Sequence, residues 1–339
     1  AKWMPRKGPK ANIIRRYLKM SPKQYRKLLV GLTNVVETKM CAKDWKSIDY
    51  SKLPSLASSR YQKTFMKNDE ERYEEYKRAL VDGKTTINAG AVYPYDIIKS
   101  IKHGGEKDVA QAQWESLPNY MEGISERVLP VVDVSGSMTT PAGNNGNVTC
   151  MDVSTSLGMY ISERNEGVFK NAFITFSSKP QLQLLEGSLV DRLDQLERAD
   201  WGMNTDLQAT FKLILDQAVK HNVPVSEMPT KVLILSDMEF DSAISDNYGY
   251  NDLSVWSPTA QEMIKGMYEE AGYEMPGIVY WNIQSRQDNV PTRFDEMGTA
   301  LVSGFSPSIM KSILSCQDMT PYNMMMETIG STRYESITV

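Results

Sequence analysis

The pattern of hydrophobic and polar positions changes near residue 125. Before that point, apolar residues recur at intervals of three and four, which is the spacing of amphipathic helices. The clearest case begins at Ser21-Pro22, a capping residue followed by a first-turn proline, and predicts one helix that continues to Met40. Further helices are predicted over residues 56–68, 69–83, 93–104 and 108–123.

After residue 125, apolar stretches alternate with helical patterns. Strands are predicted over residues 127–134, 168–177, 181–186, 231–237, 277–283 and 300–306. Helices are predicted over residues 151–164, 189–198, 206–221, 257–272 and 307–315. Strands that are apolar throughout are typical of a parallel sheet covered on both faces. The sequence therefore predicts an α/β fold with a doubly wound, mostly parallel, Rossmann-like sheet. An all-α domain precedes it, and a HEAT-like helical repeat would account for the pattern of that domain.

Three segments follow from this change of pattern. Residues 1–125 form the helical domain with a basic N-terminus, residues 126–320 form the α/β domain, and residues 321–339 form a C-terminal tail.

Composition limits the cellular compartments in which the protein is expected. The chain of 339 residues contains no stretch of ~20 apolar residues, and its first residues lack the apolar segment of a signal peptide, so we expect a soluble protein with no membrane partner. The three cysteines, Cys41, Cys150 and Cys316, offer neither a disulfide framework nor a paired zinc motif. We expect a reducing, cytoplasmic compartment.

Charge is distributed unevenly along the chain. Residues 1–30 contain ten Lys/Arg and no acidic residue, so the rest of the chain has 28 Lys/Arg against 42 Asp/Glu, a net charge of −14. A basic end of this kind is either a solvated arm or a surface that binds phosphate-rich polymers such as RNA, or an acidic protein surface. The candidate nucleic-acid-binding residues are Lys2, Arg6, Lys7, Lys10, Arg15 and Arg16.

The stretch VLPVVDVSGSM, residues 128–138, carries the most specific chemistry. Asp133, Ser135 and Ser137 follow a predicted buried strand, and alternate residues of an extended turn point the same way. Carboxylates and hydroxyls suit a hard divalent cation, so we expect Mg²⁺, with Mn²⁺ and Ca²⁺ left open. Two further oxygen donors are Thr205, in a loop before a helix, and Asp237, at the end of another strand. The alternative for an isolated motif is a strand, a turn and a helix cap.

These five positions resemble the metal-ion-dependent adhesion site of the von Willebrand factor A family. The resemblance implies that Ser135 and Ser137 bind the ion directly, that Asp133 and Asp237 balance its charge, and that Thr205 changes with the state of the site. It also implies one coordination position for an outside ligand, commonly a carboxylate of a partner. The expected partner is therefore a protein with an exposed carboxylate, or a second copy of the chain.

Several stretches, including AKDWKSIDYSKLPS and WGMNTDLQATF, also resemble an uncharacterised family known as a domain of unknown function. The layout of a helical half before such a module resembles the Ro autoantigen (TROVE) proteins, and this likeness implies RNA binding by analogy. One departure from the von Willebrand A pattern is the insert at 139–150, which is either a lid over the cation or a surface loop.

Enzymatic function finds little support in the sequence. No phosphate-binding loop and no dinucleotide fingerprint is present, so no nucleotide cofactor is expected. The two histidines, His103 and His221, follow no nucleophile elbow. We therefore expect a non-catalytic binding protein. The alternatives are an RNA-binding component of a ribonucleoprotein and an assembly subunit of a larger particle, such as a viral one.

Overall fold

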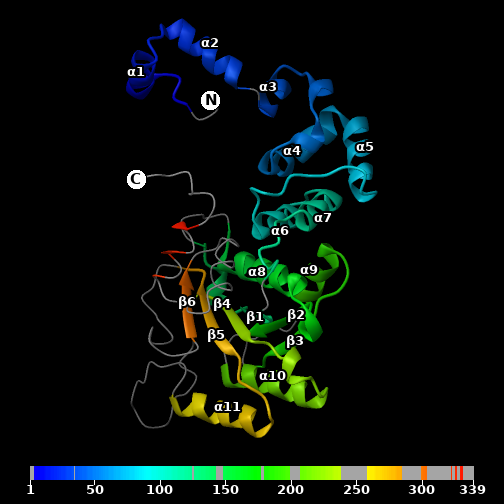
Figure 1. Ribbon diagram of the computed structural model, residues 1–339. Coiled ribbons are helices and arrows are strands. Elements are labelled where there is room, and N and C mark those ends of the chain that lie inside the picture. Colours follow the sequence, from blue (N-terminus) through cyan, green and yellow to red (C-terminus); the bar gives the residue numbers. More distant parts are fainter. Residues whose placement is uncertain are drawn as a thin grey trace. The chain divides into compact units, whose positions relative to one another are not determined.

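The computed structural model describes residues 4–33, 35–123, 126–142, 148–176, 179–198, 207–237, 258–284 and 299–303, and a few residues near the C-terminus. The helix predicted at 307–315 and most of the predicted tail lie outside this part. The chain forms two compact units, Ala1–Ala91 and Val92–Val339 (Figure 1).

The first unit is helical, as predicted. Its described α-helices are α1 (Gly8–Tyr17), α2 (Pro22–Leu32), α3 (Val36–Cys41), α4 (Ser55–Asn68) and α5 (Glu70–Val81). The cap predicted at Ser21 is present and is half of a capping box, because the Ser21 hydroxyl accepts from the Gln24 amide while the Gln24 side chain accepts from the Ser21 amide.

The prediction of one continuous helix from residue 22 to Met40 was wrong. Helix α2 ends at Leu32, and α3 begins only after Val35, whose backbone is extended. The Thr33 hydroxyl donates to the carbonyl of Leu29 and so competes with the helical hydrogen bond. Thr33 and Val35, which are β-branched, also weaken a helix at this break. Hydrophobic periodicity alone does not reveal such a break.

An aromatic cluster forms the core of the first unit between α4, α5 and the segment before them. Tyr50 lies edge-on to Phe65 and to Tyr73, with ring centroids 5.1 Å apart in both pairs. The hydroxyl of Tyr50 donates to Asp69, which also receives a hydrogen bond from Arg72. Aromatic and charged residues in this unit therefore pack against one another.

The second unit contains the sheet. Its helices are α6 (Pro94–Lys102), α7 (Lys107–Glu115), α8 (Cys150–Arg164), α9 (Leu189–Glu197), α10 (Leu207–Lys220) and α11 (Pro258–Glu270). Its strands are β1 (Val128–Asp133), β2 (Ala172–Phe176), β3 (Gln181–Leu184), β4 (Lys231–Ser236), β5 (Gly277–Asn282) and β6 (Thr299–Ser303). Among the described residues these strands form one six-stranded sheet in the order β3-β2-β1-β4-β5-β6.

The sheet confirms the predicted fold class. All neighbouring strands are parallel except β2 and β3, which form an antiparallel pair at one edge. Chain order reverses between β1 and β4, where a doubly wound fold places its ligand crevice.

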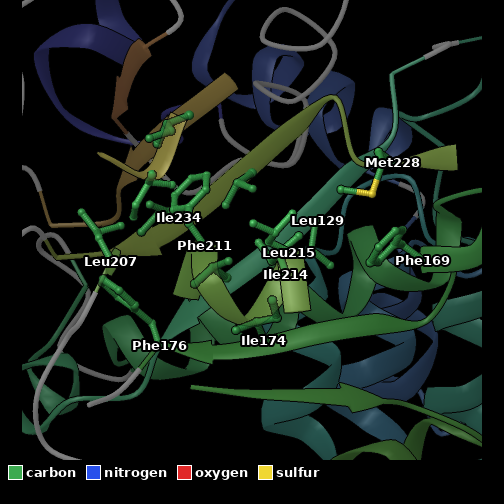
Figure 2. Packing of buried hydrophobic residues seen from close by; sticks show 14 of the residues in the cluster. Leu129, Phe169, Ile174, Phe176, Leu207, Phe211, Ile214, Leu215, Met228 and Ile234 are labelled. Atoms are coloured by element: carbon green, nitrogen blue, oxygen red, sulfur yellow. The ribbon is translucent and has the colours of Figure 1, made fainter. Parts of the chain in front are cut away.

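Helices cover both faces of the sheet (Figure 1). On one face α8 packs so closely that Gly158 leaves no room for a side chain against Val132 and Phe173. On the other face α10 and α11 cover a large apolar cluster in which Phe211 and Ile214 contact residues of β1, β2 and β4 (Figure 2). The hydroxyl of Tyr268 in α11 donates to the carbonyl of Phe211 in α10 and joins these two helices.

Helices α6 and α7 belong to the same compact unit as the sheet, although their periodicity resembles that of the preceding helices. Helix α6 packs against α8, and Lys102 forms a 3.0 Å ion pair with Asp152. The compact units therefore divide between Ala91 and Val92, whereas the change in sequence pattern lies near residue 125. In the described part of the chain, no helix is both long and apolar enough to cross a membrane.

Candidate metal centre

Strand β1 carries a fully buried carboxylate at its carboxyl end. All six residues of β1 are buried, and Asp133 is the last of them. Directly after the strand, the amide of Ser135 donates a 2.9 Å hydrogen bond to Oδ1 of Asp133. This bond closes the turn, and a short 3₁₀ helix, Gly136–Thr139, follows.

The turn brings the two predicted serines together. The hydroxyl oxygens of Ser135 and Ser137 lie 3.0 Å apart. Ser135 is buried and Ser137 is partly exposed, so the pair lies on the solvent side of the buried Asp133 carboxylate.

Asp237 comes from a neighbouring strand and joins the same group. It follows β4 directly, is 2% exposed, and its Oδ1 accepts a 3.3 Å hydrogen bond from the Ser137 hydroxyl. Since β1 and β4 are adjacent, parallel and at the point where chain order reverses, their carboxyl ends meet at one edge of the sheet. The structure thus brings together four of the five predicted residues, Asp133, Ser135, Ser137 and Asp237, whereas Thr205 lies outside the described residues.

Sequence reasoning missed a further residue of this group. The hydroxyl of Ser236, the last residue of β4, donates a 2.6 Å hydrogen bond to Oδ2 of Asp133. The register pairs Val132 with Leu235, which puts the next residues of both strands side by side. The only signal in the sequence was a serine at the end of an otherwise apolar strand.

The electrostatics of the site favour a cation. Burial raises the pKa of Asp133 to about 6, and the nearby charge of Asp237 acts in the same direction, although hydrogen bonds from Ser236 and Ser135 oppose it. Two buried carboxylates in one place repel each other and lack the hydration that an exposed pair has. A bound divalent cation would offset both costs.

The donor set fits a hard divalent ion. Two carboxylates and two hydroxyls are oxygen donors of the kind that Mg²⁺ takes together with water. Among the described residues, no group of three or more His, Cys, Asp and Glu side chains gathers to hold a metal. Because all four side chains donate oxygen, the residues at the ends of β1 and β4 suit Mg²⁺ or a similar ion better than zinc, which commonly takes nitrogen and sulfur ligands.

The segment after the serine turn is tied to the end of β5. The Gln284 side chain donates to the Thr140 hydroxyl at 3.2 Å and accepts from the Cys150 thiol at 3.5 Å. Of the insert at 139–150, residues 143–147 lie outside the described part, but its two ends are paired, with a Pro141–Thr149 bridge and a 2.8 Å bond from the Ala142 amide to the Val148 carbonyl. The insert therefore starts and ends at a fixed place beside the site.

The candidate basic residues have different surroundings. Arg15 is partly buried and donates to the carbonyl of Met20, which precedes α2. Arg6, which precedes α1, donates to the hydroxyl of Thr33, which follows α2. Lys7, Lys10 and Arg16 are exposed. Lys2 lies outside the described residues.

The region that contains this site matches a protein-family model. A model described as "Domain of unknown function (DUF7788)" matches residues 127–335, which is more than half of the chain. The chain belongs to this family. A second model, "Domain of unknown function (DUF2828)", matches residues 5–124, so the resemblance to an uncharacterised family divides between two models that meet where the sequence pattern changes.

Similar proteins include one curated relative. The uncharacterized protein L728 of Acanthamoeba polyphaga mimivirus is 28% identical over 362 aligned residues, which cover 97% of this chain. The chain spans 60% of the length of that relative.

Two solved structures are more distantly similar. The RO (RSR) protein of Deinococcus radiodurans is 17% identical, with 70% of this chain and 44% of that chain covered and a TM-score of 0.38. An aerotolerance-related membrane protein from Bacteroides fragilis is 12% identical, with 56% of this chain and 96% of that chain covered and a TM-score of 0.31.

Proposed function

We propose that the α/β unit is a non-catalytic binding module that holds Mg²⁺, or a similar divalent ion, and uses it to engage a carboxylate of a partner. The observation that carries the proposal is the chain of contacts at the sheet edge, in which Ser137 lies between Ser135 and Asp237 while Asp133 holds the turn. When bound, the ion supplies a Lewis-acidic position for an acidic group.

Each residue has a separate part in this function. The two carboxylates, Asp133 and Asp237, neutralise the ion, and the two hydroxyls, Ser135 and Ser137, add neutral ligands. Two carboxylates against a dication leave no excess negative charge, so an incoming carboxylate is not repelled. Partly exposed Ser137 marks the side from which a partner approaches.

The setting that we propose is a reducing one. Cys41 is an exposed free thiol, which an oxidising compartment would leave open to disulfide exchange. We therefore place the protein in the cytoplasm.

The test is metal-dependent stabilisation. In thermal unfolding of the full chain, adding Mg²⁺ after chelation should raise the Tm of the wild type, because a ligand that binds only the folded state stabilises it. Asp133→Asn and Ser137→Ala should lose this increase. Ser226→Ala should keep it, because this exposed serine lies before the amino end of β4, whereas the site lies at the carboxyl end. Equal Mg²⁺ responses in all four proteins would show that the ion does not bind here.

The partner class is tested separately. A fluorescent polyglutamate peptide should bind the wild type in Mg²⁺ and not in chelator, and a polyglutamine peptide should bind in neither. Light scattering with and without chelator then separates binding of a foreign carboxylate from self-association. If Mg²⁺ raises the Tm but promotes neither carboxylate binding nor self-association, the ion has only a structural role. That outcome would contradict the proposed binding function.

A further inference from the structure

The first two helices form a small, strongly basic hairpin, residues 4–33. It contains nine Lys/Arg and no Asp or Glu. Its own core is small: Ala11, Tyr25 and Leu29 are buried, and Ile14 and Met20 pack against them. The hairpin therefore uses only one face of α1 for its internal packing.

A second apolar face of α1 is exposed. Ile13 and Tyr17 are 66% and 88% exposed and are four residues apart, so they lie on the same side of the helix. Lys10 lies one turn before Ile13, and Arg16 lies three residues after it, so basic side chains flank the apolar pair. On α2, Val30 is exposed as well.

Most of the basic side chains of this hairpin are exposed to solvent, where a partner could contact them. Eight of its basic side chains are exposed and form no ion pair with another described residue: Arg6, Lys7, Lys10, Arg16, Lys19, Lys23, Arg26 and Lys27. Like charges held this close destabilise the isolated hairpin, and an anionic surface would reverse that effect.

We propose that the α1–α2 hairpin docks on the surface of an anionic lipid bilayer. Ile13 and Tyr17 enter the interfacial region, where an aromatic ring with a polar tip is favoured, and the surrounding Lys and Arg side chains contact the head groups. Exposed aliphatic side chains favour this partner over nucleic acid. Phosphates of RNA attract Lys and Arg, and bases stack on Tyr17, but Ile13 and Val30 gain nothing from either contact.

This binding is peripheral and independent of the metal centre. The earlier expectation of no membrane partner rested on the absence of a membrane-spanning stretch, and a helix that lies on the surface spans nothing.

Vesicle flotation of the full chain tests the proposal. The protein should float with vesicles of phosphatidylcholine and phosphatidylserine but not with phosphatidylcholine alone, and the bound fraction should fall with salt. The variant Ile13→Ser/Tyr17→Ser should reduce affinity by at least about tenfold without any change in charge. Lys10→Gln/Arg16→Gln should weaken binding and reduce its dependence on salt.

Matched controls use exposed residues of the second unit. Val168→Ser/Val219→Ser removes the same kind of exposed apolar side chain, and Lys170→Gln/Lys220→Gln removes the same charge. Both should float as the wild type does, and a helical circular dichroism spectrum identical to the wild type should accompany each hairpin variant. Equal losses in controls and hairpin variants, equal binding to neutral vesicles, or no flotation would overturn the proposal. Binding of a single-stranded RNA oligonucleotide without flotation would assign the surface to nucleic acid instead.

Discussion

The Ser236 hydroxyl donates a 2.6 Å hydrogen bond to Oδ2 of Asp133, so the last residue of β4 fixes the carboxylate at the end of β1. The other carboxylate oxygen accepts from the Ser135 amide, and both oxygens are thereby held in place before any ion binds. A carboxylate oriented by its neighbours loses little conformational freedom when it coordinates a metal.

Ser236→Ala is therefore expected to destabilise the protein. It removes the partner of a fully buried carboxylate oxygen, at a cost of about 1–3 kcal/mol in the free energy of unfolding. Urea unfolding without metal measures this cost. Ser226→Ala, at an exposed position, should change the free energy by less than about 0.5 kcal/mol, and equal effects of the two substitutions would contradict the role assigned to Ser236.

The start of α8 gives a prediction for pH. Burial acts to raise the pKa of Asp152, but the ion pair with Lys102 and hydrogen bonds from Thr149 outweigh it and hold the pKa below its ordinary value. A carboxyl with a lowered pKa stabilises the fold above its unfolded pKa, and this contribution is lost as the pH falls through the folded pKa. Asp152→Asn should thus cost about 1 kcal/mol at pH 7 and progressively less below about pH 4. Urea unfolding at pH 7 and below about pH 4 measures this cost in the free energy of unfolding. An equal cost at both pH values would argue against the charge of Asp152 as its source.

Gly158 provides a test of packing between α8 and the sheet. A Cβ there would lie 2.5 Å from the Val132 side chain and 2.7 Å from the Phe173 ring. Gly158→Ala should destabilise the unit by about 1–3 kcal/mol, despite the better helix propensity of alanine. Gly266, in α11, has nothing within 4 Å of a built Cβ, so Gly266→Ala should be neutral or stabilising by up to about 1 kcal/mol. Thermal unfolding of both variants decides whether the tight contact between α8 and the sheet limits the residue at 158.

Much of the α/β unit follows from the sequence because its signals are local. Continuous apolar runs such as residues 232–235 indicate a buried parallel sheet, and each strand and helix predicted within the described part of this unit is present in some form. The proximity of Asp133 and Asp237 also follows, since Asp133 ends β1 and Asp237 directly follows β4, its neighbour in a doubly wound sheet. Ser236 was not predictable in the same way, because its contact depends on strand register.

Two other features differ from the prediction, one for a local reason and one because it depends on tertiary contacts. Helix α7 was expected to reach residue 123 but ends at Glu115, shortly before Pro118, which cannot continue a helix. The grouping of α6 with the sheet rests on packing against α8 and on the Lys102–Asp152 pair, two residues fifty positions apart. Hydrophobic pattern reports which face of a helix is buried, but not which neighbour buries it.

The pairing of Pro141 with Thr149 fixes the two anchor points between which residues 143–147 run. Because these anchors hold each other, a replacement peptide grafted between them would leave the serine turn on one side and the first turn of α8 on the other unchanged. The graft site lies beside the proposed metal centre, so a fluorescent reporter inserted there would sense partner binding while Asp133, Ser135, Ser137 and Asp237 stay unaltered.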